Sequence, residues 1–159
     1  MIAEFHEKQK FTQWWLWGLL VFIAILPFII SSSILDLPNS IEEQFSDSST
    51  SLLVSLFVIF IIILFLTFTL KTDITKREIK MSFFPFIKKT IKWNEIKSAE
   101  VINYGFVGGW GIRLFTQYGT VYNIGGNKGL ALELQNGKKL LIGTQKEEEL
   151  RRFINEIRN

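Results

Sequence analysis

Hydrophobic positions fall into two unbroken runs, followed by a region in which they alternate with polar ones. The runs are residues 14–35 and 51–70, and neither contains a charged residue. The second run is mostly Leu, Ile, Val and Phe and has no Gly or Pro. About 20 helical residues, rising 1.5 Å each, cross the roughly 30 Å hydrocarbon core of a bilayer. The pattern therefore predicts two transmembrane helices, at residues 14–35 and 51–70.

A cleaved signal peptide is the alternative interpretation of the first run. The preceding residues 1–13 contain two acids and two lysines, so they lack a distinctly positive leader. The apolar stretch is also longer than that of a signal peptide. Trp14, Trp15 and Trp17 suit the aromatic belt at a membrane interface. These features favour a retained helix.

Charge is distributed unevenly around the two runs. The segment 36–50 between them contains four acidic residues and no Lys or Arg, whereas Lys and Arg are abundant over residues 71–92. Basic residues near membrane-spanning helices stay on the cytoplasmic side. We therefore expect a multi-pass protein of the inner (plasma) membrane with a cytoplasmic tail at 1–13, an acidic outer loop at 36–50 and a cytoplasmic C-terminus.

Residues 71–159 have the composition of one small folded domain. Most of this segment alternates between apolar and polar residues with period two, as half-buried strands do. Ile79, Met81 and Phe83, for example, are expected on one side of a strand. The alternation predicts about seven short strands.

Turn and helix signals complete this domain. Asn136-Gly137 is the residue pair that a type I′ hairpin turn favours. Thr144 followed by Glu147 matches a capping box, which marks the start of a helix. An apolar stripe with helical spacing follows at Leu150, Phe153, Ile154 and Ile157. We expect a bent antiparallel sheet and one C-terminal amphipathic helix that covers it.

Two segments carry a resemblance to a known family. The stretches GGWGIRLF (108–115) and YNIGGNKGLALELQNGKKLLIGTQ (122–145) resemble small bacterial membrane proteins that have a pleckstrin-homology-like (PH-like) domain behind two transmembrane helices. The resemblance implies an N-terminal transmembrane hairpin and a cytoplasmic PH-like bent antiparallel β-barrel of about seven strands, closed by a C-terminal α-helix. Some PH domains bind phosphoinositide head groups through basic residues, but no defined basic motif of that kind is carried over to this chain.

Three groups of residues are candidates for contact with lipid or a partner. The first is a basic band, whose charge either only fixes membrane topology or also contacts anionic head groups. The second is a pair of phenylalanines beside Pro85, which either enter a head-group region or pack over the domain. The third lies among glycines and either lines a groove or fills the core. The groups are Lys71, Lys76, Arg77, Lys80, Lys88 and Lys89; Phe84 and Phe86; and Trp110 and Arg113.

Enzymatic function is not expected. The chain has no cysteine, and its one histidine, His6, precedes the first run. No Ser/His/Asp triad, Cys/His pair or nitrogen/sulfur metal cluster can therefore be assembled in residues 71–159. No G-x-G-x-x-G or G-K-S/T motif occurs. We expect no catalytic, cofactor or metal site.

The sequence instead favours a non-enzymatic, membrane-anchored PH-like binding module. Its expected partners are the lipid bilayer, anionic lipid head groups and an unidentified protein. Nucleic acid is not expected, because the basic excess is modest and no reading motif is present. The alternative is a structural or assembly subunit of a membrane protein complex that acts mainly through its transmembrane hairpin.

Overall fold

The computed structural model describes residues 4–31 and 48–158 and divides the chain into two compact units. A sheet unit combines residues 1–11 with residues 68–159. A helix unit comprises residues 12–67. The N-terminal segment thus belongs to the same unit as the C-terminal half of the chain.

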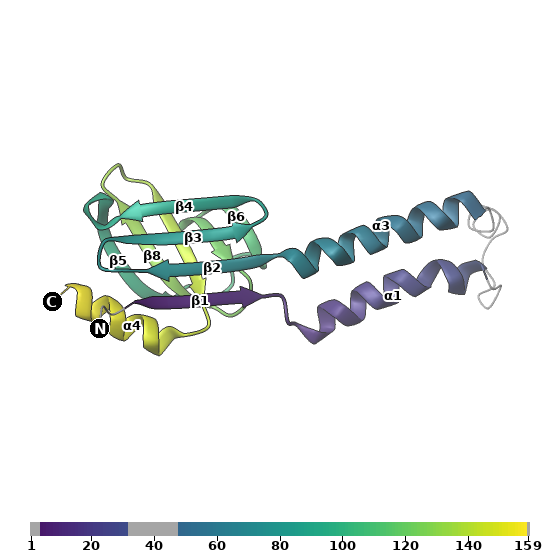
Figure 1. The fold of residues 1–159 in the computed structure, drawn as a ribbon, viewed down its shortest axis with the longest axis horizontal. Coiled ribbons are helices and arrows are strands. Elements are labelled where there is room, and N and C mark those ends of the chain that lie inside the picture. Colours follow the sequence, from purple (N-terminus) through teal and green to yellow (C-terminus); the bar gives the residue numbers. More distant parts are fainter. Residues whose placement is uncertain (1–3, 32–47, 159) are drawn as a thin grey trace. The chain divides into compact units, whose positions relative to one another are not determined.

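The described part of the sheet unit contains two sheets, one short 3₁₀ helix and one α-helix (Figure 1). Sheet A has the strand order β1-β2-β3-β4, and sheet B has the order β5-β8-β9-β7-β6. Neighbouring strands are antiparallel except β7 and β9, which are parallel. The strands are β1 (Phe5–Lys10), β2 (Thr69–Ile74), β3 (Glu78–Phe84), β4 (Ile87–Lys92), β5 (Ile96–Asn103), β6 (Gly111–Thr116), β7 (Gly119–Asn123), β8 (Lys128–Leu134) and β9 (Lys139–Thr144). The 3₁₀ helix η1 (Trp93–Glu95) joins β4 to β5.

The core follows the alternation seen in the sequence. Ile79, Met81 and Phe83 of β3 are all buried, which confirms that they share the inner side of that strand. The hairpin between β8 and β9 is also present, but its type differs from the prediction. Gly137 has a positive φ of 79° and Asn136 does not, whereas a type I′ turn needs both.

The predicted C-terminal helix is present as α4 (Glu147–Arg158), and it buries three of the four residues of its predicted apolar stripe, whereas Ile157 is only half-buried. Leu150, Phe153 and Ile154 are buried, and the ring of Phe153 lies 6.4 Å from that of Phe5. The helix contacts both β5 and β1, which are edge strands of different sheets. The predicted capping box is wrong. Helix α4 begins at Glu147, so Thr144 lies before its N-terminal cap position. The Thr144 hydroxyl donates to the Glu7 carboxylate (2.6 Å) and accepts from the backbone N–H of Lys146 (3.0 Å).

The predicted PH-like β-barrel is wrong. The described residues form an α+β unit with two sheets, and neither sheet closes on itself. A barrel requires hydrogen-bonded neighbours all the way round, and it would have to join the edge strands of the two sheets. Strand β1 is an edge of sheet A, and β5 is an edge of sheet B. Helix α4 contacts both strands through side-chain packing, where a barrel would require backbone hydrogen bonds between sheet edges.

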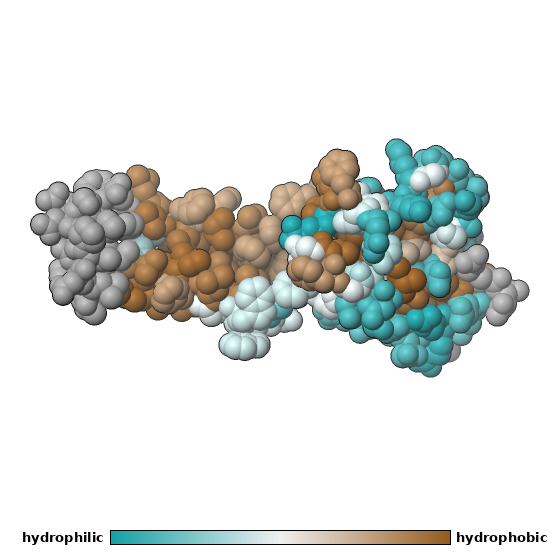
Figure 2. All heavy atoms as spheres, turned by 180° about the vertical axis from the view of Figure 1, so that it is seen from behind, coloured by the Kyte–Doolittle hydropathy of each residue, from teal (hydrophilic) through white to brown (hydrophobic). Residues whose placement is uncertain are grey.

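The described part of the helix unit contains α1 (Trp14–Ser31) and α3 (Ser48–Thr67), which contact one another. Leu20 and Val58 are buried, whereas most of the other large apolar side chains described on these helices are exposed. Figure 2 shows this as a nearly continuous brown surface, in contrast to the largely teal surface of the sheet unit.

The predicted transmembrane helices are also wrong. Within the described residues, no helix combines the length and the apolar character needed for a membrane span. Helix α3 begins in a Ser/Thr-rich segment and ends at Thr67, and Thr69 and Leu70 belong to β2 instead. Its apolar part, Leu52 to Leu66, has about 15 residues and so a length of about 22 Å, against roughly 30 Å for a hydrocarbon core.

The predictions of membrane location and orientation depended on those spans and are therefore also wrong. The multi-pass inner-membrane location and the orientation of both termini are not supported, because both require spanning helices. The end of the first run and most of the predicted acidic outer loop, residues 32–47, lie outside the described residues.

Candidate functional site

Strand β1 brings N-terminal lysines onto the outer face of sheet A. Its side chains alternate strictly, so that Lys8 and Lys10 are exposed while Glu7 and Gln9 are buried. The Gln9 side-chain amide donates to the Gly143 carbonyl oxygen at 2.7 Å. Glu7 accepts hydrogen bonds from the Thr144 hydroxyl at 2.6 Å and from the backbone N–H of Gln145 at 2.7 Å. These inward bonds to β9 fix which side of β1 faces outward.

Strand register places three lysines in one row across sheet A. Lys8 is opposite Lys71, Lys71 is opposite Ser82, and Ser82 is opposite Lys88. Directly opposite residues in antiparallel strands share a face of the sheet, with Cβ atoms about 5 Å apart. The row therefore crosses all four strands of sheet A and contains no carboxylate.

Lys10 extends this positive area into the adjacent row. It is opposite Thr69, which is opposite Phe84. Among the described residues, Lys8, Lys10, Lys71 and Lys88 have no ion pair or side-chain hydrogen bond. Like charges directly opposite one another destabilise a sheet, so this arrangement opposes the stability of the fold.

Two exposed phenylalanines border the lysine row. Phe84 is 50% exposed and Phe86 is 58% exposed, and both lie at the turn between β3 and β4. The Phe86 ring lies 5.4 Å from that of Phe68, which also contacts Phe11 and the buried Phe83. Phe68 thus connects the exposed Phe86 ring to the buried rings of Phe11 and Phe83. We call Lys8, Lys10, Lys71, Lys88, Phe84 and Phe86 the lysine–phenylalanine surface.

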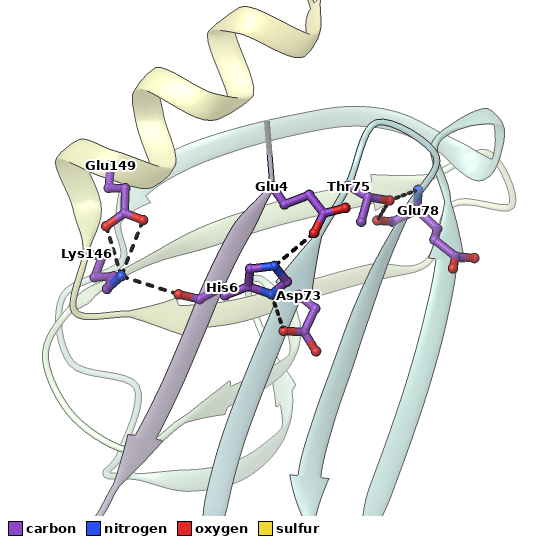
Figure 3. A network of polar contacts seen from close by, with 7 residues as sticks. All are labelled: Glu4, His6, Asp73, Thr75, Glu78, Lys146 and Glu149. Carbon is purple, nitrogen blue, oxygen red and sulfur yellow. Dashed lines mark hydrogen bonds and ion pairs between the residues drawn. The ribbon is translucent and has the colours of Figure 1, made fainter. Parts of the chain in front are cut away.

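The other end of the same outer face carries carboxylates (Figure 3). The two ring nitrogens of His6 lie 2.7 Å from Asp73 Oδ1 and 3.1 Å from Glu4 Oε2. The hydrogen bond to Asp73, and then that to Glu4, raise the pKa of His6 above its ordinary value of 6.5. Lys80 pairs with Glu78 at 2.7 Å. The outer face of sheet A thus carries four lysines without an ion pair at its Phe84 end, and mainly carboxylates and their partners, together with Lys92 opposite Glu78, at the other end.

The structure separates the candidates named from sequence. Lys71, Lys88, Phe84 and Phe86 lie together, and Lys80 shares their face but is paired with Glu78. Lys76 and Arg77 are exposed in the turn between β2 and β3, at the opposite end of the sheet from Phe84. Lys89 belongs to the other side of β4, where its amine lies 5.2 Å from the centre of the Tyr122 ring.

Trp110 and Arg113 lie away from sheet A. Trp110 precedes β6 and is half-buried, and Arg113 lies within β6 in sheet B. The Arg113 guanidinium lies against the Cα of Gly109, so closely that a Cβ there would collide with it. This packing suits a structural role for Arg113, and it brings neither residue to the lysine–phenylalanine surface.

Sequence reasoning missed Lys8 and Lys10. The inward residues next to them, Glu7 and Gln9, are polar, so the segment lacks the apolar alternation that indicates a strand. A strict period-two pattern of lysines after Phe5 was the one available signal. Without knowledge of the pairing with β2, that pattern is equally typical of a solvated tail.

Within the part of the chain that the structure describes, no group of three or more His, Cys, Asp or Glu side chains is placed to hold a metal ion. The surface can supply positive charge, apolar contact area and hydrogen-bond donors. It offers these to a broad, flat ligand, because the residues are spread over four strands.

Comparison with known proteins adds no family assignment. No protein-family model matches the chain, and no curated protein does either. The predicted kinship with bacterial PH-like proteins therefore has no support from these searches, and the two open sheets contradict it.

Proposed function

We propose that this protein is a non-enzymatic binding module that attaches to anionic phospholipid head groups through the lysine–phenylalanine surface. The observation that carries the proposal is the row Lys8–Lys71–Ser82–Lys88, which crosses sheet A without a carboxylate and borders two exposed phenylalanines. A row of unpaired like charges destabilises the fold, and a negatively charged partner would offset this repulsion.

The expected strength follows from the number of lysines. Each lysine close to an anionic lipid surface contributes about 1 kcal/mol, and the contribution fades within a Debye length of roughly 8 Å. Four lysines therefore supply about 4 kcal/mol, which corresponds to roughly a thousandfold in affinity. Phe84 and Phe86 add apolar area that can enter the boundary between head groups and acyl chains.

The flat geometry favours a lipid surface over an acidic protein. Specific protein interfaces usually carry a buried core of anchoring residues set in pockets. The lysine–phenylalanine surface instead presents long flexible side chains on an open sheet, with two aromatic rings at one border. Such a surface is suited to many mobile phosphates rather than to one fixed epitope.

Vesicle sedimentation of the full chain tests the proposal. The probes are neutral phosphatidylcholine vesicles and vesicles that also contain phosphatidylglycerol. We expect binding to the charged vesicles to be at least tenfold tighter and to weaken as salt is raised. The difference between the two vesicle types is the readout, because exposed apolar side chains do not discriminate head-group charge.

Two matched triple variants locate the interaction. Replacing Lys8, Lys71 and Lys88 by Gln should remove most of the preference for charged vesicles. The control replaces Lys76, Arg77 and Lys92 by Gln, which changes the net charge equally but leaves the lysine–phenylalanine surface intact. Equal losses in the two variants would show that only overall charge matters and would refute the proposed site. Failure of the wild-type chain to prefer charged vesicles would refute the proposed function itself.

A further inference from the structure

A second feature of the sheet unit lies away from the lysine–phenylalanine surface. A hollow of about 270 Å³, open to solvent, is lined by residues of β4, the β6–β7 hairpin and the β8–β9 hairpin. Its volume lies just below the roughly 300–1,000 Å³ typical of small-molecule sites. Its apolar lining includes Leu114, Phe115, Leu134 and Leu140.

Phe115 at the rim of this hollow has an unusual backbone. It is the only described non-glycine residue with positive φ, at 58°, and its side chain is 98% exposed. Positive φ is a true outlier for a bulky residue, and such outliers gather at ligand-binding sites. The register between β6 and β7 shifts between Arg113 and Thr116, which accommodates this conformation. The Phe115 ring is thus exposed to solvent on a strained backbone, and its burial does not stabilise the free protein.

Positive charge surrounds the apolar lining. Lys89, Lys138 and Lys139 line the hollow, and none of its described lining residues is acidic. Lys139 is opposite Glu133 on β8, but the Glu133 carboxylate is paired with Lys97 at 2.6 Å. Lys138 is exposed beside the Gly137 turn, and Lys89 reaches in from sheet A.

We propose that this hollow binds a small anionic amphiphile, with its single charged head group on Lys89 and Lys138 and its short apolar chain against Leu114 and Phe115. Charge complementarity selects an anion, and the exposed leucine and phenylalanine select an alkyl chain over a sugar or a bare ion. The site shares no residue with the lysine–phenylalanine surface, so either proposal can fail without the other.

Calorimetric titration of the full chain tests this site with three probes: octanoate, which has both charge and chain, 1-octanol, which has only the chain, and acetate, which has only the charge. We expect saturable octanoate binding at least tenfold tighter than that of either partial probe. Equal binding of octanol, or no saturable binding of octanoate, would overturn the proposal.

The variant Phe115→Asn separates binding from folding. Asn tolerates positive φ far better than Phe, so this variant should melt at the same temperature or higher. We expect it to bind octanoate at least fivefold more weakly, and Lys138→Glu should do the same. The control is Lys92→Glu, which removes an exposed lysine of β4 outside the hollow and should leave affinity unchanged. Wild-type affinity in Phe115→Asn would place octanoate elsewhere and refute the site.

Discussion

Replacing Lys71 by Glu should stabilise the sheet unit while weakening its binding to anionic vesicles. Lys71 lies within the lysine row, directly opposite Lys8 and two strands away from Lys88. The substitution converts a repulsive cross-strand pair into an attractive one. Stability and binding are therefore expected to change in opposite directions.

The size of the stability change follows from Coulomb's law. Two unit charges about 6 Å apart in water interact by about 0.7 kcal/mol. Changing the sign of one charge replaces repulsion by attraction, so the unscreened change in stability is twice this energy, about 1.4 kcal/mol. Screening with a Debye length of about 8 Å reduces this change by half, to about 0.7 kcal/mol. The result falls within the roughly 0.2–1 kcal/mol measured for cross-strand pairs.

Salt dependence distinguishes this mechanism from an accidental gain in packing. The gain should approach about 1.1 kcal/mol at 0.01 M salt, where the Debye length is about 30 Å, and fall to about 0.2 kcal/mol at 1 M, where it is about 3 Å. Urea unfolding at these salt concentrations, followed by the near-ultraviolet circular dichroism of the aromatic residues, measures it. Lys76→Glu, in the turn at the far end of the sheet, is the control.

Two outcomes would contradict the reasoning. A gain that does not change with salt would mean that charge repulsion in the lysine row is not its source. An unchanged preference of Lys71→Glu for charged vesicles would mean that the row does not contact the head groups, whatever its effect on stability.

Two further predictions concern the sheet unit. First, because its carboxylate partners raise the pKa of His6 above 6.5, His6 stabilises the fold fully below that pH, and this contribution is lost as pH rises through the folded pKa. Urea midpoints of wild type and His6→Gln should therefore converge from pH 5.5 to 8.5, and a constant gap would contradict the assignment. Second, Gly119→Ala should cost at least about 3 kcal/mol or prevent folding, because a Cβ would collide with the Lys139 carbonyl oxygen. Gly137→Ala, with similar positive φ but open space around it, should cost only about 1–2 kcal/mol, and thermal melts that rank the two equally would refute the steric argument.

Strands with one apolar side could be predicted from the sequence, and β1 could not. Burial of every second residue leaves a clear signal where the inward residues are apolar, as in β3. In β1 the inward residues Glu7 and Gln9 are polar, and each forms a hydrogen bond with β9, more than 130 positions away in the chain. No local pattern contains that information. Lys8 and Lys10 of the proposed surface therefore could not be predicted from the sequence, whereas Lys71 and Lys88 could.

The boundary between α3 and β2 illustrates a second limit. Thr69 and Leu70 extend the apolar run without a break, so hydropathy assigns them to the preceding helix. Both are buried in sheet A, where they pair with β1 and β3. An unbroken apolar run is equally compatible with a helix that continues and with a helix that ends in a buried strand. Only the pairing partners decide between these alternatives, and they lie elsewhere in the sequence.

The polarity of the outer face explains why its carboxylates do not cancel the lysine row. Residues two apart on a strand are separated by about 6.7 Å, so Glu78 lies about 13 Å along β3 from Ser82. That distance exceeds a Debye length of about 8 Å, and Glu78 is in any case paired with Lys80. Asp73 is only one such step from Lys71, but it is held by His6. If the proposed function holds, an anionic surface that approaches at the Phe84 end meets these lysines first, and we expect sheet A to be tilted on that surface rather than flat.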